Sequence, residues 1–127
     1  LMINYFSKYK FFFYLCNFIL IILYLFPGSI LGWYLYNDVS LQPQITPNFI
    51  VSSNHVYTFL TLSFVGFFTY QKIEQLKFLS IYLISLSIIL EILHYFIPER
   101  DFEFRDLFGN LVGVIMVIII FYFFKKK

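Results

Sequence analysis

Four long apolar stretches dominate the sequence and restrict the folds open to it. A membrane-spanning helix needs about 20 mostly apolar residues, and stretches of that kind cover roughly 11–35, 53–71, 78–97 and 106–124. Of the 127 residues, 61% are hydrophobic and only 13% are charged, which lies outside the usual range of a soluble domain. The sequence therefore predicts an all-α integral membrane protein: one membrane domain over residues 1–127, built as a bundle of four transmembrane helices with short loops.

The first stretch is longer than one span requires, and Pro27-Gly28 interrupts it. Proline breaks or kinks a helix because it lacks the backbone N–H and its ring clashes with the preceding turn. We expect the span to kink or end there, with 29–36 lying near the membrane interface. The stretch also lacks an Ala-x-Ala-like cleavage site, which favours a retained span over a removed signal peptide.

The distribution of basic residues predicts the orientation, since short cytoplasmic loops carry the excess of Lys and Arg. Only Arg100 and Arg105 lie in the loops on one side, where acids outnumber them. The other side carries seven lysines: Lys8, Lys10, Lys72, Lys77, Lys125, Lys126 and Lys127. Interfacial aromatics agree with this arrangement: Trp33, Tyr34 and Tyr36 at an outer end, Tyr70 and Tyr122 at inner ends. We therefore expect a multi-pass protein of the cytoplasmic (inner) cell membrane, N-in and C-in, with its first and third loops outside.

Composition also excludes several classes of function. The net charge of +2 is small and the basic residues are dispersed, so no nucleic-acid-binding surface is expected. Cys16 is the single cysteine, which rules out an intramolecular disulfide and a thiolate metal cluster. Neither a Ser-His-Asp order nor a Gly-rich phosphate loop is present. The bilayer itself is the one partner that the composition requires.

The ionisable residues within the apolar stretches are few, and together with one asparagine they fall at matching depths. Ionisable groups inside a membrane are costly and mark functional sites or interior contacts. With the predicted orientation, all of them lie within roughly 10 Å of the outer boundary, at a rise of 1.5 Å per residue. They are His55, Glu91, His94, Asp106 and Asn110. We therefore expect them to converge near the outer surface.

Helical spacing places these residues on two faces, because residues three and four apart lie on the same side of a helix. Ser80, Ser87, Glu91 and His94 form one polar stripe; Asp106, Asn110 and Gly113 form another. Gly109 and Gly113 make a Gly-x-x-x-Gly pair, which lets two helices approach closely. We expect that approach to bring Asn110 within hydrogen-bonding reach of a neighbouring helix.

Each polar residue also has a purely structural interpretation. Asp106 is a candidate N-cap of the last helix, Ser52 is one of several candidate N-caps for the second, and Asn110 can join helices by hydrogen bonds alone. Glu91 is harder to explain this way, because a carboxylate inside the span needs a partner or a proton. His94, His55 or Arg100 can serve as that partner.

Glu91-x-x-His94 together with His55 and Asp106 has the composition of a metal site, since imidazole and carboxylate ligands suit zinc. Glu-x-x-His is common by chance, however, no His-Glu-x-x-His helix is present, and no separate general base is evident. From the sequence alone we therefore assign no metal and no cofactor.

The run from Glu91 to Gly113, with His55 upstream, resembles the VanZ-like membrane protein family. That family has a His opening one helix, Glu-x-x-Gln followed by Phe and a Pro-x-Arg hairpin, and then Asp, three residues, Asn, two residues and Gly on the next helix. The matching residues are His55, Glu91, Phe96, Pro98, Arg100, Asp106, Asn110 and Gly113. His94 departs from the common Gln. The resemblance covers about residues 50–120.

The resemblance implies a cell-envelope role at the outer face. The family takes its name from a member associated with resistance to the glycopeptide teicoplanin, so the implied roles are envelope homeostasis or glycopeptide-type antibiotic resistance. Our leading hypothesis is a protein that binds an envelope lipid or cell-wall component in an outward-facing pocket lined by His55, Glu91, His94, Arg100, Asp106 and Asn110. Arg100 would engage an anionic head group through its planar fork. Two alternatives stay open: an intramembrane enzyme, metal-assisted or not, acting on a lipid-linked substrate, and a structural or assembly protein.

Overall fold

The computed structural model describes residues 2–41, 43, 50–70, 72–98 and 100–125. All the regular structure in these residues is helical. In chain order the helices are α1 (Met2–Leu25), α2 (Ile30–Tyr36), α3 (Ser53–Thr69), α4 (Ile73–Leu93), the short 3₁₀ helix η1 (His94–Phe96) and α5 (Phe104–Lys125). Pro47 and Asn48 of the long first loop, and Lys126 and Lys127 of the predicted lysine anchor, lie outside the described residues.

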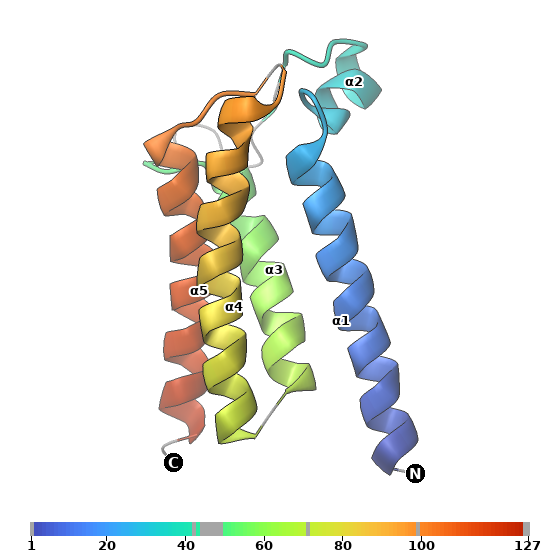
Figure 1. Ribbon diagram of the computed structural model, residues 1–127, viewed down its shortest axis with the longest axis vertical. Helices are drawn as coiled ribbons and strands as arrows, with labels where there is room; N and C mark the ends of the chain where they lie inside the picture. Colours follow the sequence, from blue (N-terminus) through green and yellow to red (C-terminus); the bar gives the residue numbers. More distant parts are fainter. Residues whose placement is uncertain (1, 42, 44–49, 71, 99, 126–127) are drawn as a thin grey trace.

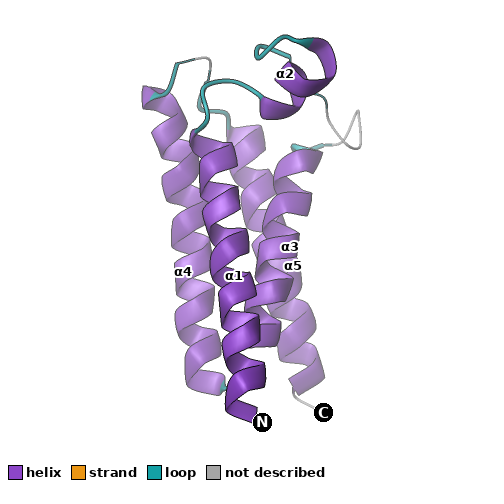
Figure 2. Cartoon of the chain, turned by 90° about the vertical axis from the view of Figure 1, so that its right-hand side faces the viewer, coloured by secondary structure: helices purple, strands orange, loops and turns teal. Residues whose placement is uncertain are grey.

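The four long helices run side by side as a bundle (Figures 1 and 2). The start of α1, the end of α5 and the connection from α3 to α4 lie at one end. The connection from α4 to α5 and the short α2 lie at the other end, with α2 beyond the ends of the long helices. The first and third loops therefore share one end of the bundle, as the sequence predicted, and the lysines of the second loop lie at the opposite end.

Two helical segments are long and apolar enough to cross a membrane: Glu74–Phe96 and Phe104–Phe123. Lys10–Leu25 and Ile30–Tyr36 make a third candidate if the two are one span, although they are bent by 74°. The remaining helix, α3, has 17 residues, fewer than the roughly 20 of a typical span. These two or three candidate spans indicate a membrane protein, and they correspond to two or three of the four predicted stretches.

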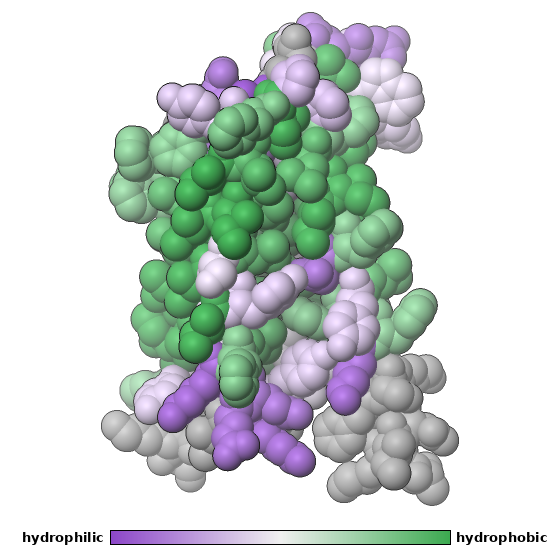
Figure 3. Space-filling model, in the orientation of Figure 1, coloured by the Kyte–Doolittle hydropathy of each residue, from purple (hydrophilic) through white to green (hydrophobic). Residues whose placement is uncertain are grey.

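Apolar side chains face outward, which agrees with a lipid environment. Ile81 is 65% exposed and Ile119 is 60% exposed, although both lie within the apolar stretches. Figure 3 shows a broad hydrophobic band across one face of the molecule, with hydrophilic residues gathered at both ends. A soluble bundle would cover such side chains, because water penalises contiguous apolar surface.

Pro27 ends α1, as the sequence predicted. Gly28 follows with φ of +90°, in the region that glycine adopts without strain, and an added Cβ there would lie 2.7 Å from the Val39 carbonyl oxygen. The chain then turns into α2, where the Ser29 hydroxyl accepts a hydrogen bond from the backbone N–H of Gly32. The break places the open end of α1 beside the hairpin between α4 and α5.

Small residues let α5 pack tightly against α3. A Cβ added at Gly113 would lie 2.6 Å from the backbone oxygen of Val56, and one at Gly109 would lie 2.8 Å from that of Ser52. Such distances are possible only between backbones with no side chain in between. The predicted close approach at Gly109 and Gly113 is confirmed, and the helix it meets is α3.

The apolar core occupies the middle of the bundle and leaves the polar residues to one end. It is formed by Phe13, Leu20, Tyr24, Phe59, Leu62, Phe67, Leu79, Leu83, Leu90, Val114 and Val117. Most of these residues recur at three- or four-residue intervals, as expected for the inner stripe of a packed helix. At the end nearest α2, polar side chains replace them.

Candidate functional site

The structure brings five of the six predicted site residues into one buried cluster. His55 lies in the first turn of α3, Glu91 near the end of α4, His94 in η1, and Asp106 and Asn110 near the start of α5. Glu91, His94 and Asn110 are at most 1% exposed. The predicted convergence of these residues is therefore observed, but most of them lie beneath the surface.

Asn110 joins three other helices through its side-chain amide. Its Nδ2 donates to the Ser87 carbonyl on α4 at 3.0 Å, which fixes the orientation of the amide. Its Oδ1 then accepts a hydrogen bond from the Tyr24 hydroxyl of α1 at 2.6 Å and lies 2.8 Å from Nδ1 of His55 on α3. Losing any of these buried hydrogen bonds is costly, because the remaining partner would have no water molecule to bond with.

Glu91 and His94 form a buried pair on neighbouring turns. Nε2 of His94 donates to the Tyr24 carbonyl at 2.9 Å, because a carbonyl can only accept. Nδ1 lies 3.3 Å from Oε1 of Glu91, and that oxygen also accepts the backbone N–H of Glu103 at 3.3 Å. The contact between Nδ1 and Oε1 needs a proton on one of the two groups, so Glu91 has the partner that its position demanded.

Arg100 and His94 supply donors that the end of α1 lacks. Proline has no N–H, so Pro27 cannot donate to the Leu23 carbonyl four residues earlier. The Arg100 Nη2 donates to Leu23 at 2.9 Å and its Nε donates to the Phe26 carbonyl at 3.1 Å. Burial lowers the pKa of the Arg100 guanidinium, and the nearby Tyr24, Asp106 and Glu91 raise it.

These contacts add a structural role to the one expected for Arg100. Its Nε and Nη2 donate to carbonyl oxygens, so the edge of the guanidinium formed by these two nitrogens is engaged with α1. These bonds use two of the five N–H donors of the guanidinium, and Arg100 also lines both pockets. In the structure, Arg100 ties the hairpin between α4 and α5 to the broken end of α1.

Asp106 is not the N-cap of α5, so that structural interpretation is wrong. The helix begins at Phe104, which places Asp106 in its first turn. The backbone N–H groups of Asp106 and Leu107 both donate to the carbonyl of Glu103. The Asp106 carboxylate accepts a hydrogen bond from Ser52 and lies 3.7 Å from Nε2 of His55. It therefore faces the cluster. Ser52 is the N-cap residue of α3 but makes no side-chain cap bond.

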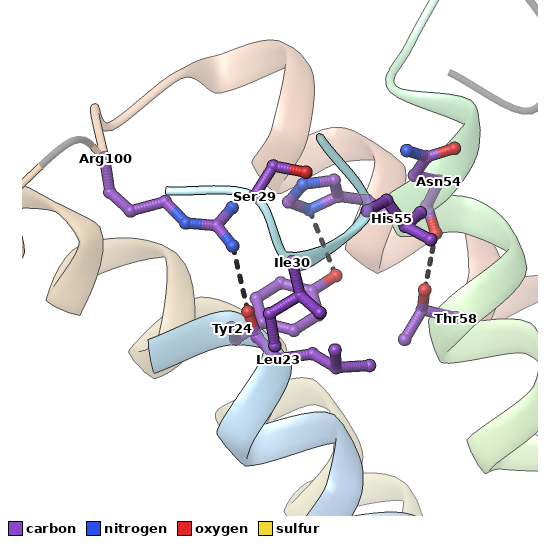
Figure 4. A pocket seen from close by; sticks show the side chains of 9 residues that line it. Leu23, Tyr24, Ser29, Ile30, Asn54, His55, Thr58 and Arg100 are labelled. Carbon is purple, nitrogen blue, oxygen red and sulfur yellow. Dashed lines mark hydrogen bonds between the residues drawn. The ribbon is translucent and has the colours of Figure 1, made fainter. Parts of the chain in front are cut away.

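Two adjoining pockets open from the cluster at the α2 end of the bundle. The larger, of about 260 Å³, is lined by Gly28, Ser29, Val39, Ser40, His55, His94, Arg100, Asp101, Glu103 and Asp106. The smaller, of about 120 Å³, lies between α1, α2 and α3, and its walls are more apolar. Figure 4 shows the smaller pocket, with the Tyr24 hydroxyl pointing at the His55 ring and Arg100 reaching toward the end of α1. Glu91 and Asn110 line neither pocket, so they support the lining from behind.

Tyr24 is the residue that sequence reasoning missed. Its hydroxyl contacts Asn110 and His55, its ring stacks on His94 with centroids 5.6 Å apart, and its carbonyl accepts from His94. In a chain with 11 tyrosines and 19 phenylalanines, one more aromatic in an apolar stretch is not distinctive. The sequence feature that could have identified Tyr24 is its position three residues before Pro27, in the last turn of a helix that the proline must end.

Comparisons with known proteins add no relative: no family model, no curated protein and no solved structure matches the chain.

Proposed function

We propose that this chain is a VanZ-like, multi-pass protein of the cell membrane that binds the polar part of an envelope lipid or cell-wall component. The binding site is the larger pocket at the α2 end of the bundle, and the bound molecule takes part in envelope homeostasis or glycopeptide resistance. One observation carries the proposal. Ionisable side chains from α3, η1 and α5 line a pocket of about 260 Å³ at the α2 end of a bundle whose middle is apolar.

The location of the pocket favours a ligand that is part lipid and part polar. Its walls carry His55, His94, Arg100 and Asp106 together with the hydroxyls of Ser29 and Ser40. The adjoining smaller pocket is lined by Leu23 of α1 and Leu31 of α2, which are 38% and 45% exposed. A molecule with an acyl or prenyl chain can therefore place its polar part in the pocket and its chain along the apolar surface.

A purely structural role explains less of the site. Hydrogen bonds from Asn110 and Arg100 would be enough to hold the helices together. They do not account for the position of the Asp106 carboxylate, which lies at the pocket wall 3.7 Å from Nε2 of His55. A charge beside the buried Glu91 is costly to keep, which favours a use for it.

The proposal includes four spans with both ends in the cytoplasm. The seven lysines against two arginines support it, as does the shared location of the first and third loops. The helix α3 would be the fourth span, since it packs along α5 and connects the two ends of the bundle. Its 17 residues rise about 26 Å at 1.5 Å each, close to the roughly 30 Å of a bilayer core.

Ligand-induced stabilisation tests the binding function. The purified chain in mild detergent would be unfolded by heat, following the fluorescence of Trp33, the single tryptophan. Four probes would be added in turn: phosphatidylglycerol, phosphatidylcholine, a polyprenyl phosphate and a soluble muramyl peptide. We expect at least one to raise the unfolding temperature, because a ligand that binds only the folded state stabilises it.

Paired variants show whether the pocket is responsible. Asp106→Asn changes a pocket acid, while Glu74→Gln makes the same kind of change at an exposed position in the first turn of α4, at the opposite end of the bundle. The stabilisation should be lost in Asp106→Asn and kept in Glu74→Gln. The proposal is wrong if none of the four probes stabilises the protein, or if the stabilisation survives Asp106→Asn.

A further inference from the structure

Three side chains from three helices converge at the inner wall of the larger pocket. One nitrogen of His55 and one carboxylate oxygen each of Glu91 and Asp106 all lie within 4.8 Å of one another. We propose that these three groups bind a divalent transition-metal cation of the zinc class. This inference adds a metal ion to the proposed binding site. It rests on the proposed function only for the identity of the molecule that would occupy the remaining coordination positions.

Hydrogen bonds fix which nitrogen of His55 is available. The Asn110 amide is oriented by Ser87, so the atom that faces Nδ1 of His55 at 2.8 Å is an oxygen, and Nδ1 must donate to it. In a neutral imidazole, Nε2 then carries a lone pair. That nitrogen lies 3.7 Å from Oδ2 of Asp106, too far for a hydrogen bond. Metal-binding histidines typically donate the other ring N–H to an oxygen acceptor, and the Asn110 amide oxygen takes that place here.

Glu91 presents an oxygen that nothing in the described part of the chain satisfies. Its Oε1 is held by His94 and by the backbone N–H of Glu103. Its Oε2 is buried and has no hydrogen-bond partner among the described residues; it lies 3.9 Å from Nδ1 of His55, the ring nitrogen that donates to Asn110. An orphaned carboxylate oxygen is expensive in a buried site. A metal ion would satisfy it while His94 keeps the carboxylate in place.

Electrostatics also favour a cation over an anion at this point. Two carboxylates so close together repel each other unless a proton or a cation lies between them. The outer wall of the pocket adds Asp101 and Glu103, and Arg100 is already engaged with the end of α1. Phosphate alone would therefore meet a negative wall. A metal ion would reverse that charge and let an oxygen of the ligand bind.

The donor set indicates the kind of metal. One imidazole and two carboxylates make a mixed nitrogen and oxygen set, which suits Zn²⁺ and neighbouring transition ions better than Ca²⁺. Zn²⁺ bonds to these ligands are about 2.0–2.2 Å, which places ligand atoms about 3.4 Å apart in a tetrahedron. The 3.7 Å between Nε2 of His55 and Oδ2 of Asp106 is close to that spacing, and all three donor atoms lie within 4.8 Å of one another, so binding would draw the three side chains together. Three protein ligands leave a position open for water or an oxygen of the bound molecule.

The test uses metal ions alone. The full chain in detergent is stripped with a chelator, dialysed against Zn²⁺, Mn²⁺, Mg²⁺ or Ca²⁺, and analysed for metal content and unfolding temperature. We expect about one Zn²⁺ per chain and a higher unfolding temperature, with little effect of Mg²⁺ or Ca²⁺. Replacing Zn²⁺ by Co²⁺ should give the visible absorption of a low-coordinate nitrogen and oxygen site.

Two matched variants decide between a metal site and unspecific binding to acids. Asp106→Asn removes a proposed ligand, and Asp101→Asn removes an exposed acid of the same pocket that is not one. We expect zinc affinity to fall by at least about 10–100-fold in the first and to stay unchanged in the second. If Asp106→Asn does not fold, the Co²⁺ spectrum of the unaltered chain still decides. Absence of stoichiometric metal and of that spectrum would overturn the inference and leave a shared proton between the carboxylates.

Repeating the lipid titration with and without chelator separates the two proposals. Loss of metal binding with lipid stabilisation intact would overturn the metal site and leave the proposed function standing. Metal binding with no response to any of the four probes would overturn the proposed function and leave the metal site standing.

Discussion

Replacing Gly113 by alanine tests the close approach of α5 to α3, on which the geometry of the site depends. The new Cβ would lie 2.6 Å from the Val56 oxygen and 2.9 Å from the Leu60 nitrogen, both backbone atoms that cannot rotate away. Ordinary contact begins near 3.4 Å, so the two helices must separate by about 0.8 Å. Such overpacking typically costs about 1–3 kcal/mol.

The separation would also reach the polar cluster. Asn110 lies one turn from Gly113 and contacts His55 across the same interface at 2.8 Å. A shift of 0.8 Å along that contact would take it beyond hydrogen-bonding distance. We therefore expect lower stability together with weaker ligand stabilisation. The free energy of unfolding would be measured by titrating the protein in mild detergent with a denaturing detergent, following Trp33 fluorescence.

Gly66→Ala is the matched control. Its new Cβ would meet only Phe13 and Leu79 side-chain atoms, at 2.9 and 3.0 Å, and the tips of these side chains can rotate. The intrinsic helix preference for alanine, about 1 kcal/mol over glycine, acts equally in both variants and cancels in the comparison. A Gly113→Ala protein as stable as Gly66→Ala would refute the reasoning.

Two further predictions concern the end of α1. Tyr24→Phe should lower the free energy of unfolding by about 1 kcal/mol, because Asn110 loses a donor while the ring stays packed; an equal loss in Tyr95→Phe, where the tyrosine is 74% exposed, would contradict this. Arg100→Lys should speed amide hydrogen exchange in 28–36, because an ammonium cannot reproduce two fixed bonds to Leu23 and Phe26. Exchange no faster than in Arg105→Lys, at an exposed arginine of the same hairpin, would show that Arg100 does not hold this end.

Periodicity and depth predicted much of the candidate site. Polar residues were rare enough in the apolar stretches that their distance from the stretch ends indicated a common level. That common level and the glycine pair on α5 together explain why five residues meet: His55, Glu91, His94, Asp106 and Asn110. The break at Pro27 was equally visible, since it depends on the covalent chemistry of proline alone.

Other features depended on contacts between distant segments. The role of Asp106 changed because α5 begins two residues earlier than the acid, which no local rule specifies to that precision. Arg100 was expected to face a ligand, and it contacts the carbonyls left open by Pro27, more than seventy positions away. Tyr24 was overlooked because its contacts with Asn110, His55 and His94 are made by other helices and have no signal in the local sequence.

By itself the sequence determined an apolar, helical bundle whose charges lie near its two ends and whose buried ionisable groups lie near one of them, because hydropathy and helix-breaking residues act locally on the backbone. Only the tertiary structure decided which atoms meet: the amide that orients His55, the contact between His94 and Glu91, and the carboxylate oxygen left without a donor. The physical reason is that hydrogen bonding and metal ligation depend on distances of a few tenths of an ångström, which helix packing sets and residue order does not.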